Sequence, residues 1–214
     1  MRQDLLTTIL TIPAILIGFT FHEFAHAKVA DRLGDKTPKF QGRLSLNPMV
    51  HIDPIGFIMI LLFRFGWAKP VQVNPSAFKN YHKDDLKVSI AGPIANLIVA
   101  FISGAILYLM NKFIPFNVTP VFDIVVGILY RIISITIWIN CMLFFFNLIP
   151  IPGLDGFHIL RDLFPKIFYK YEEQIYRYQI VFLIIFIMTP LSTYIVGGPT
   201  MKVTTFIFDL FNLI

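Results

Sequence analysis

Long apolar runs constrain this chain more than any other feature, and the first of them, residues 5–20, contains no charged side chain. Hydrophobic residues make up 56% of the 214 residues and charged residues only 14%, whereas a soluble domain is about 25% charged. About 20 apolar residues are enough for a helix to cross a bilayer. The sequence therefore predicts an all-α polytopic membrane protein without a separate soluble domain.

Four full spans are predicted, at residues 5–29, 86–110, 121–147 and 180–196. Two further apolar segments, 55–63 and 201–214, are short for a crossing, so the total is four to five transmembrane helices. For the first of these short segments we expect a re-entrant path. Val71 and Val73 alternate with Gln72 between two prolines, which predicts a short β-like hairpin near the cytoplasmic side.

Basic residues in the loops predict the orientation of the chain. By the positive-inside rule, the ends of the first and third spans face the cytoplasm and the N-terminus lies outside a cell membrane. We interpret these loops as solvated and in contact with lipid headgroups. This contact accounts for the net charge of +5, so nucleic acid is not a predicted partner. The basic residues concerned are Lys28, Arg32, Lys36, Lys39, Arg43, Arg161, Lys166, Lys170 and Arg177.

Metal-binding residue types occur inside the first apolar run, in the order His22-Glu23-Phe24-Ala25-His26. On a helix, His22 and His26 lie on one face and can both bind one Zn²⁺ at about 2.0–2.1 Å. Glu23 lies beside that face, where it can accept a proton from a water on the metal. A chance match is the alternative, but the helical context that such a motif requires is present.

Three motifs in this order resemble the site-2 protease family of intramembrane zinc metalloproteases. They are His22-Glu23-x-x-His26, Gly92-Pro93-x-x-Asn96 and Asn147-x-x-Pro150 followed by Leu154-Asp155-Gly156. Segments 42–48 and 66–75 are similar to the small bacterial and archaeal branch, which lacks PDZ and CBS domains. The resemblance implies one domain over residues 1–214, with a catalytic core at about 4–165 and C-terminal helices at about 175–214.

The resemblance also implies one Zn²⁺ per chain, bound by His22, His26 and Asp155, with Glu23 as the general base. Two physical considerations agree with Asp155. Catalytic zinc sites use three protein ligands plus water, and a carboxylate at a broken membrane helix is costly unless it has a partner or a metal. The alternative is that Asp155 caps a cytoplasmic helix. The chain's single cysteine, Cys141, excludes an internal disulfide and a cysteine zinc cluster.

Asn147 and Asn96 have two interpretations each. By resemblance, Asn147 donates a hydrogen bond to the oxyanion that develops during the reaction, but it could equally satisfy backbone groups freed by Pro150. For Asn96 we favour a structural role, either as the support of a metal ligand or as a link between helices.

The extended residues Val71, Gln72, Val73 and Asn74 are a candidate edge strand that binds an unwound substrate. A simple interfacial loop is the alternative for this segment. Three other histidines are not assigned to the metal: His51, which neighbours Asp53; His82, which is expected to be solvated; and His158, which is expected at the interface.

The implied activity is hydrolysis of a peptide bond in or near a transmembrane segment of a membrane-protein substrate, known as regulated intramembrane proteolysis. A membrane metal transporter is one alternative, but it predicts more polar residues along several helices than this chain supplies. An inactive scaffold that binds helices without cutting them is another, and the intact Glu23 disfavours it. The sequence predicts neither the identity of the substrate nor the oligomeric state.

Overall fold

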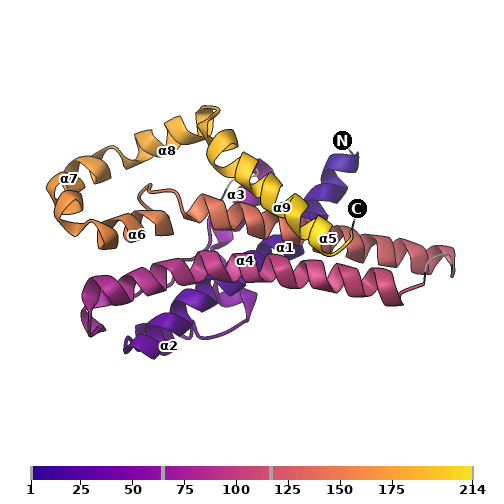
Figure 1. The fold of residues 1–214 in the computed structure, drawn as a ribbon, viewed down its shortest axis with the longest axis horizontal. Helices are drawn as coiled ribbons and strands as arrows, with labels where there is room; N and C mark the ends of the chain where they lie inside the picture. The colour runs from indigo at the N-terminus through magenta and orange to yellow at the C-terminus, as the bar shows by residue number, and fades with distance from the viewer. Residues whose placement is uncertain (1, 64–65, 116–117, 214) are drawn as a thin grey trace.

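Three long helices form the body of the molecule (Figure 1). The structure is a computed structural model, and it describes residues 2–63, 66–115 and 118–213. The long helices are α1 (Arg2–Leu33), α4 (Tyr81–Phe113) and α5 (Pro120–Asn147). At 1.5 Å per residue they are about 42–50 Å long. They are also the three described helices that are both long and apolar enough to cross a membrane.

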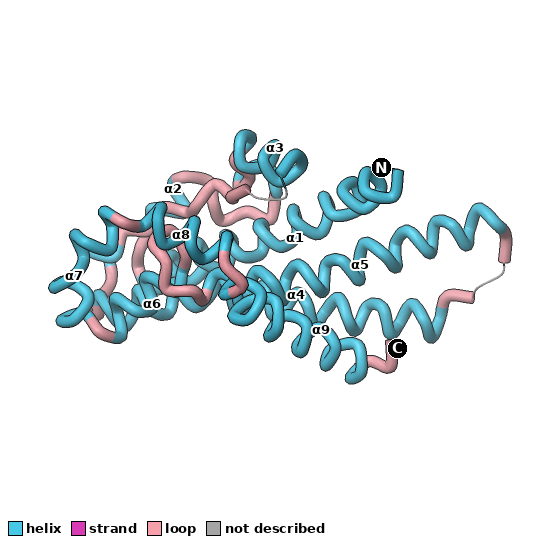
Figure 2. Tube along the Cα trace, turned by 90° about the horizontal axis from the view of Figure 1, so that it is seen from above, coloured by secondary structure: helices cyan, strands magenta, loops and turns pink. Residues whose placement is uncertain are grey.

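Small and branched apolar side chains join these helices. Ala14 and Ile15 of α1 pack against Ile139 and Leu143 of α5. A second cluster connects α4, α5 and the C-terminal helix, and it contains Ala100, Leu107, Ile137, Cys141 and Ile207. Figures 1 and 2 show α4 and α5 side by side as an antiparallel pair, with α1 against them. The first three predicted spans are confirmed as helices, and α1 continues through Pro13 without a break.

The predicted fourth span, residues 180–196, is not one helix. The chain there forms α8 (Gln179–Met188), a π-helical turn η3 (Thr193–Gly197) and α9 (Gly198–Leu210). The break falls at Thr189, whose backbone is extended (φ −101°, ψ 160°), because the residue before a proline disfavours the helical region. The expected total of four to five spanning helices is therefore not supported by the described residues.

The segment that connects α1 to α4 forms a compact excursion from the three long helices. It contains α2 (Thr37–Phe40), η1 (Pro48–Val50), α3 (Pro54–Phe63) and η2 (Pro75–Ala77). Ile52 forms an isolated antiparallel bridge with Ala68, and the Lys69 amide donates to the His51 carbonyl at 2.9 Å. The chain thus returns to the place where it left, which is the path that a re-entrant segment requires.

The predicted β-like hairpin at residues 71–74 is absent from the described structure, in which the single bridge flanks α3 instead. Two of the amides in this segment are instead bound to side chains. Val71 N–H donates to Glu23 Oε2 at 2.8 Å, and Asn74 N–H donates to Asp35 Oδ2 at 2.7 Å. The prolines on either side of this segment supply no N–H at all.

Two amphipathic helices follow the end of α5, namely α6 (Asp155–Leu163) and α7 (Pro165–Arg177). Figure 1 shows α6, α7 and α8 as an arch that leads the chain back to α9. α6 packs against the N-terminal part of α4, where Arg161 forms ion pairs with Asp85 and Asp162. This contact keeps the first residue of α6, Asp155, next to α1.

Candidate metal centre

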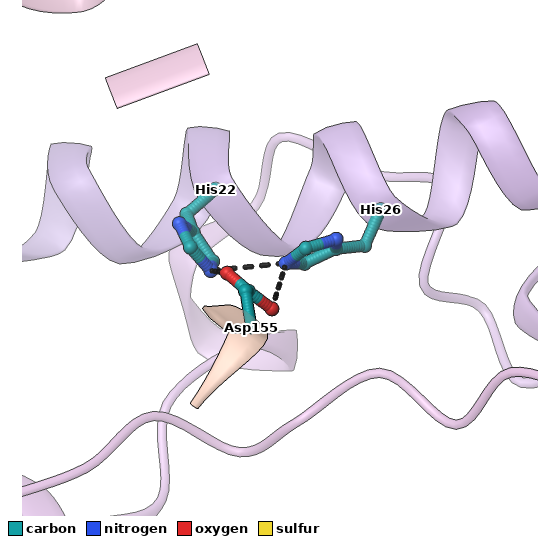
Figure 3. Close-up of side chains that lie close together, drawn as sticks. All are labelled: His22, His26 and Asp155. Carbon is teal, nitrogen blue, oxygen red and sulfur yellow. Dashed lines mark hydrogen bonds and ion pairs between the residues drawn. The ribbon is translucent and has the colours of Figure 1, made fainter. Parts of the chain in front are cut away.

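His22, His26 and Asp155 come together at the meeting point of α1 and α6 (Figure 3). The two Nε2 atoms are 3.0 Å apart. Asp155 Oδ2 is 3.1 Å from His22 Nε2, and Oδ1 is 3.2 Å from His26 Nε2. Both histidines are buried, so the three side chains form an enclosed cluster.

Asp155 reaches the histidines because the chain turns sharply after α5. Gly153 adopts a positive φ of +95°, a region that glycine enters without strain. A Cβ on Gly156 would overlap the backbone of Leu148 and Ile149. The first turn of α6 therefore lies directly on the end of α5, and the buried ring of Phe157 anchors it there.

Acceptors on α4 fix the protonation of both imidazoles. His22 Nδ1 lies 2.7 Å from Asn96 Oδ1, and His26 Nδ1 lies 2.7 Å from the Val88 carbonyl oxygen. Because oxygen atoms of this kind only accept, each Nδ1 carries the hydrogen and each Nε2 presents a lone pair. Metal-binding histidines are commonly oriented in this way by a partner on the other nitrogen.

The cluster fits a resident Zn²⁺. Two unprotonated nitrogens and a carboxylate converge, and Asp155 Oδ2 is buried without a hydrogen-bond partner in the described part of the chain. Buried acceptors that face one another are unfavourable unless a cation lies among them. Tetrahedral zinc holds nitrogen and oxygen ligands about 3.3 Å apart, close to the spacing of the three atoms. Three such ligands leave a fourth position open, as in catalytic zinc sites.

Glu23 is buried beside the cluster and contacts the excursion between α1 and α4. Its Oε2 accepts the hydrogen bond from Val71 N–H, which brings residues 71–74 to the edge of the site. Gln72 is held from the other direction, because its Oε1 accepts from Gln41 Nε2 at 2.7 Å.

The structure brings Asn96 into the site but does not direct Asn147 to it. Asn147 Nδ2 donates to the Leu143 carbonyl of its own helix at 3.0 Å, a contact of the backbone-satisfying kind. Asn96 contacts a proposed ligand, His22, and it also bonds to α1 and α5. Asn96 therefore bonds both to a residue of the cluster and to two neighbouring helices.

The remaining histidines lie outside the cluster. His51 is buried and its Nε2 contacts the Ser45 carbonyl at 2.7 Å, while Asp53 accepts from the Gly56 amide. His82, which was expected to be solvated, has a side chain that is 36% exposed, and its Nδ1 lies 2.9 Å from Asp162 Oδ1. Burial, with the nearby positive charge of Arg161, lowers the pKa of His158.

Sequence reasoning misjudged one basic residue and overlooked the role of a polar one. Arg43, expected among the solvated loop residues, is buried and donates to the carbonyls of Val50, Lys69 and Pro70. Asn140 is fully buried between helices and bonds to Asn96. An uncharged polar residue in the middle of an apolar span was the available signal for Asn140.

Comparison with known proteins agrees with this geometry. Residues 10–190 match the model of peptidase family M50. YwhC of Bacillus subtilis, which is named as a zinc metalloprotease, is 46% identical over 85% of this chain and 81% of its own length. Rip2 of Mycobacterium tuberculosis, named in the same way, is 27% identical over 94% of this chain and 74% of its own length.

No solved structure matches the chain. The family match covers the histidine pair, the asparagines and Asp155 alike, and the relatives carry the name of zinc metalloproteases. The described residues contain three apolar helices long enough to cross a membrane, and two of them, α1 and α4, contribute to or contact the cluster. The chain belongs to peptidase family M50 and is a membrane-embedded zinc metalloprotease.

Proposed function

We propose that this chain hydrolyses a peptide bond in or near a transmembrane segment of another membrane protein. His22, His26 and Asp155 hold the metal, and Glu23 is the general base. The convergence of three acceptor atoms with a buried glutamate beside them carries this proposal. The catalytic unit comprises about residues 4–165 of a single domain, and the helices at about 175–214 complete it.

When bound, zinc polarises the scissile carbonyl and makes water a stronger nucleophile at neutral pH. Glu23 accepts the proton that the attacking water loses and passes it to the leaving amine. The carboxylate is oriented for this step by the Val71 amide, which fixes one of its two oxygens. The buried side chains around it exclude bulk water from the reacting atoms.

A helical substrate must unwind before its carbonyls become accessible, and we propose that residues 71–74 hold the unwound segment. The Val71 amide places this stretch beside Glu23. Within the described residues the Val73 N–H donates to no acceptor, so it is available to a substrate strand. Val73→Pro removes this donor. We expect it to reduce cleavage with unchanged zinc content, and unchanged cleavage would contradict the strand hypothesis.

For Asn147 we retain the proposal of an oxyanion donor. Its amide has two hydrogens, and the Leu143 carbonyl accepts one of them. The other remains for the substrate oxygen, and such a donor contributes a few kcal/mol to the transition state. The active site lies towards the cytoplasmic side, as the basic loops indicate.

The decisive experiment uses purified protein in lipid vesicles with a panel of single-span membrane proteins as substrates. Glu23→Gln should abolish cleavage and retain zinc, because the amide cannot accept the proton. Glu173→Gln is the matched control, since Glu173 is exposed on α7. Cleavage that persists in Glu23→Gln would refute the mechanism. Zinc flux without any cleavage would favour a transporter.

A further inference from the structure

Buried polar contacts run without a break from His22 into the middle of α5. His22 Nδ1 meets Asn96 Oδ1 at 2.7 Å, and Asn96 Nδ2 meets Asn140 Oδ1 at 2.9 Å. Asn140 Nδ2 then meets the Thr136 carbonyl at 2.9 Å. Both asparagines are fully buried. The contacts connect α1, α4 and α5 through side chains alone until they end on a backbone oxygen.

The Thr136 carbonyl oxygen determines which way the side-chain amides of Asn140 and Asn96 are oriented. A carbonyl only accepts, so Asn140 must turn its NH₂ to Thr136 and its oxygen to Asn96. Asn96 must then present its NH₂ to Asn140, and the same nitrogen also donates to the Gly18 carbonyl at 3.0 Å. The oxygen of Asn96 is left for His22.

The last link determines the tautomer of His22. Facing an acceptor, Nδ1 carries the hydrogen and Nε2 keeps its lone pair for the cluster with His26 and Asp155. The opposite tautomer would place a hydrogen on Nε2, where it would block a metal. It would also leave two acceptors facing each other at the buried Asn96 contact, which is costly.

We propose that Asn140 is a positioning residue that, acting through Asn96, fixes the tautomer of His22 and thereby raises zinc affinity. Asn140 bonds to Asn96 and to the Thr136 carbonyl, and in the described part of the chain no hydrogen bond joins it to His22, His26 or Asp155. The proposal rests on His22 being a zinc ligand, as proposed above. The competing role for Asn140 is purely structural: as a polar link between helices it would contribute to folding and leave zinc affinity unchanged.

The first test measures zinc affinity by competition with a chromophoric chelator in detergent-solubilised protein. Asn140→Leu removes both hydrogen bonds at similar volume, and we expect zinc affinity to fall about tenfold or more. Thr136→Val is the matched control. It removes a buried hydroxyl that bonds to Ile132 within α5 but keeps the Thr136 carbonyl. Zinc affinity unchanged in folded Asn140→Leu would overturn the proposal.

A double-variant cycle tests whether Asn140 acts through Asn96. If it does, Asn96→Ala combined with Asn140→Leu should bind zinc no more weakly than Asn96→Ala alone. Independent, additive losses would show that Asn140 affects the metal by another route and would overturn the proposal.

A measurement on the unaltered protein needs no variant to fold. In zinc-free protein labelled with ¹⁵N-histidine, at a pH where imidazole is neutral, we expect the hydrogen of His22 on Nδ1. A hydrogen on Nε2 would overturn the proposal. His22→Ala distinguishes a failure of the ligand assignment from a failure of the positioning role of Asn140. If this variant leaves zinc affinity unchanged, the assignment of His22 as a ligand under the proposed function is wrong.

Discussion

At the scale of single residues, the metal cluster depends on a position without a side chain. Gly92 lies on α4 where that helix passes the two imidazole rings. A Cβ there would lie 2.6 Å from Cε1 of His22 and of His26, and it would also overlap His26 Nε2. α4 can therefore supply its acceptors to both rings only because residue 92 is glycine.

Gly92→Ala is expected to weaken zinc binding about tenfold or more. Overpacking a filled site costs about 1–3 kcal/mol, and about 1.4 kcal/mol corresponds to a factor of ten in affinity. The strain falls on the rings themselves, so chelator competition should detect it. The control is Gly127→Ala on α5, where a Cβ meets nothing within 4 Å. Equal zinc affinity in both variants would contradict this account.

Sequence reasoning at this scale works where spacing along one helix decides the geometry. The four-residue interval placed His22 and His26 on one face, and the structure shows their Nε2 atoms in contact. That α4 passes the two imidazole rings at Gly92 was not predicted from the sequence. The burial of Arg43 and the partner of Asn140 depend on segments distant in sequence, so no local pattern reveals them.

At the scale of elements, the position of α6 decides whether Asp155 reaches the histidines. An ion-pair cluster joins α6 to the N-terminal end of α4. Arg161 pairs with Asp85 and with Asp162, and His82 approaches the same Asp162. The Asp162 side chain is completely inaccessible and that of Arg161 is 14% exposed, so solvent screens this cluster only weakly.

Arg161→Met should destabilise the protein, because it leaves two buried carboxylates without their cation. Breaking a buried pair in this way costs about 3–5 kcal/mol. Arg177→Met is the control, since its pair with Glu173 is exposed on both sides and is worth about 0.5 kcal/mol or less. Thermal unfolding in detergent should show a much larger loss for Arg161→Met. Similar losses in the two variants would contradict the importance of this cluster.

Elements were predictable where an apolar run is uninterrupted. The predicted span 121–147 agrees with α5 except for one residue at its start. The run at 180–196 contains Pro190, and the helix breaks there. The alternating residues at 71–73 have the pattern of a strand, but they pair with no other strand among the residues that the structure describes. The amides of Val71 and of the adjoining Asn74 are bound instead by Glu23 and Asp35, side chains that lie far away in the sequence.

At the scale of the whole molecule, the two ends of α4 can be used to determine how the protein is oriented in the membrane. The 33 residues of α4 extend about 50 Å, so Lys83 and Lys112 lie near its opposite ends. Both side chains are exposed. The metal cluster packs against the half of α4 that contains Val88 and Asn96. The side of the membrane on which Lys83 lies is therefore also the side nearer to the active site.

Cysteine labelling can determine that side. Cys141 is fully buried, so the unaltered protein should react little with a membrane-impermeant maleimide and serves as the background. We expect Lys112→Cys to be labelled in intact cells and Lys83→Cys only in inverted membrane vesicles, because the basic loops face the cytoplasm. The reverse pattern would place the active site on the outer side. Labelling of both positions from one side would mean that α4 does not cross the bilayer.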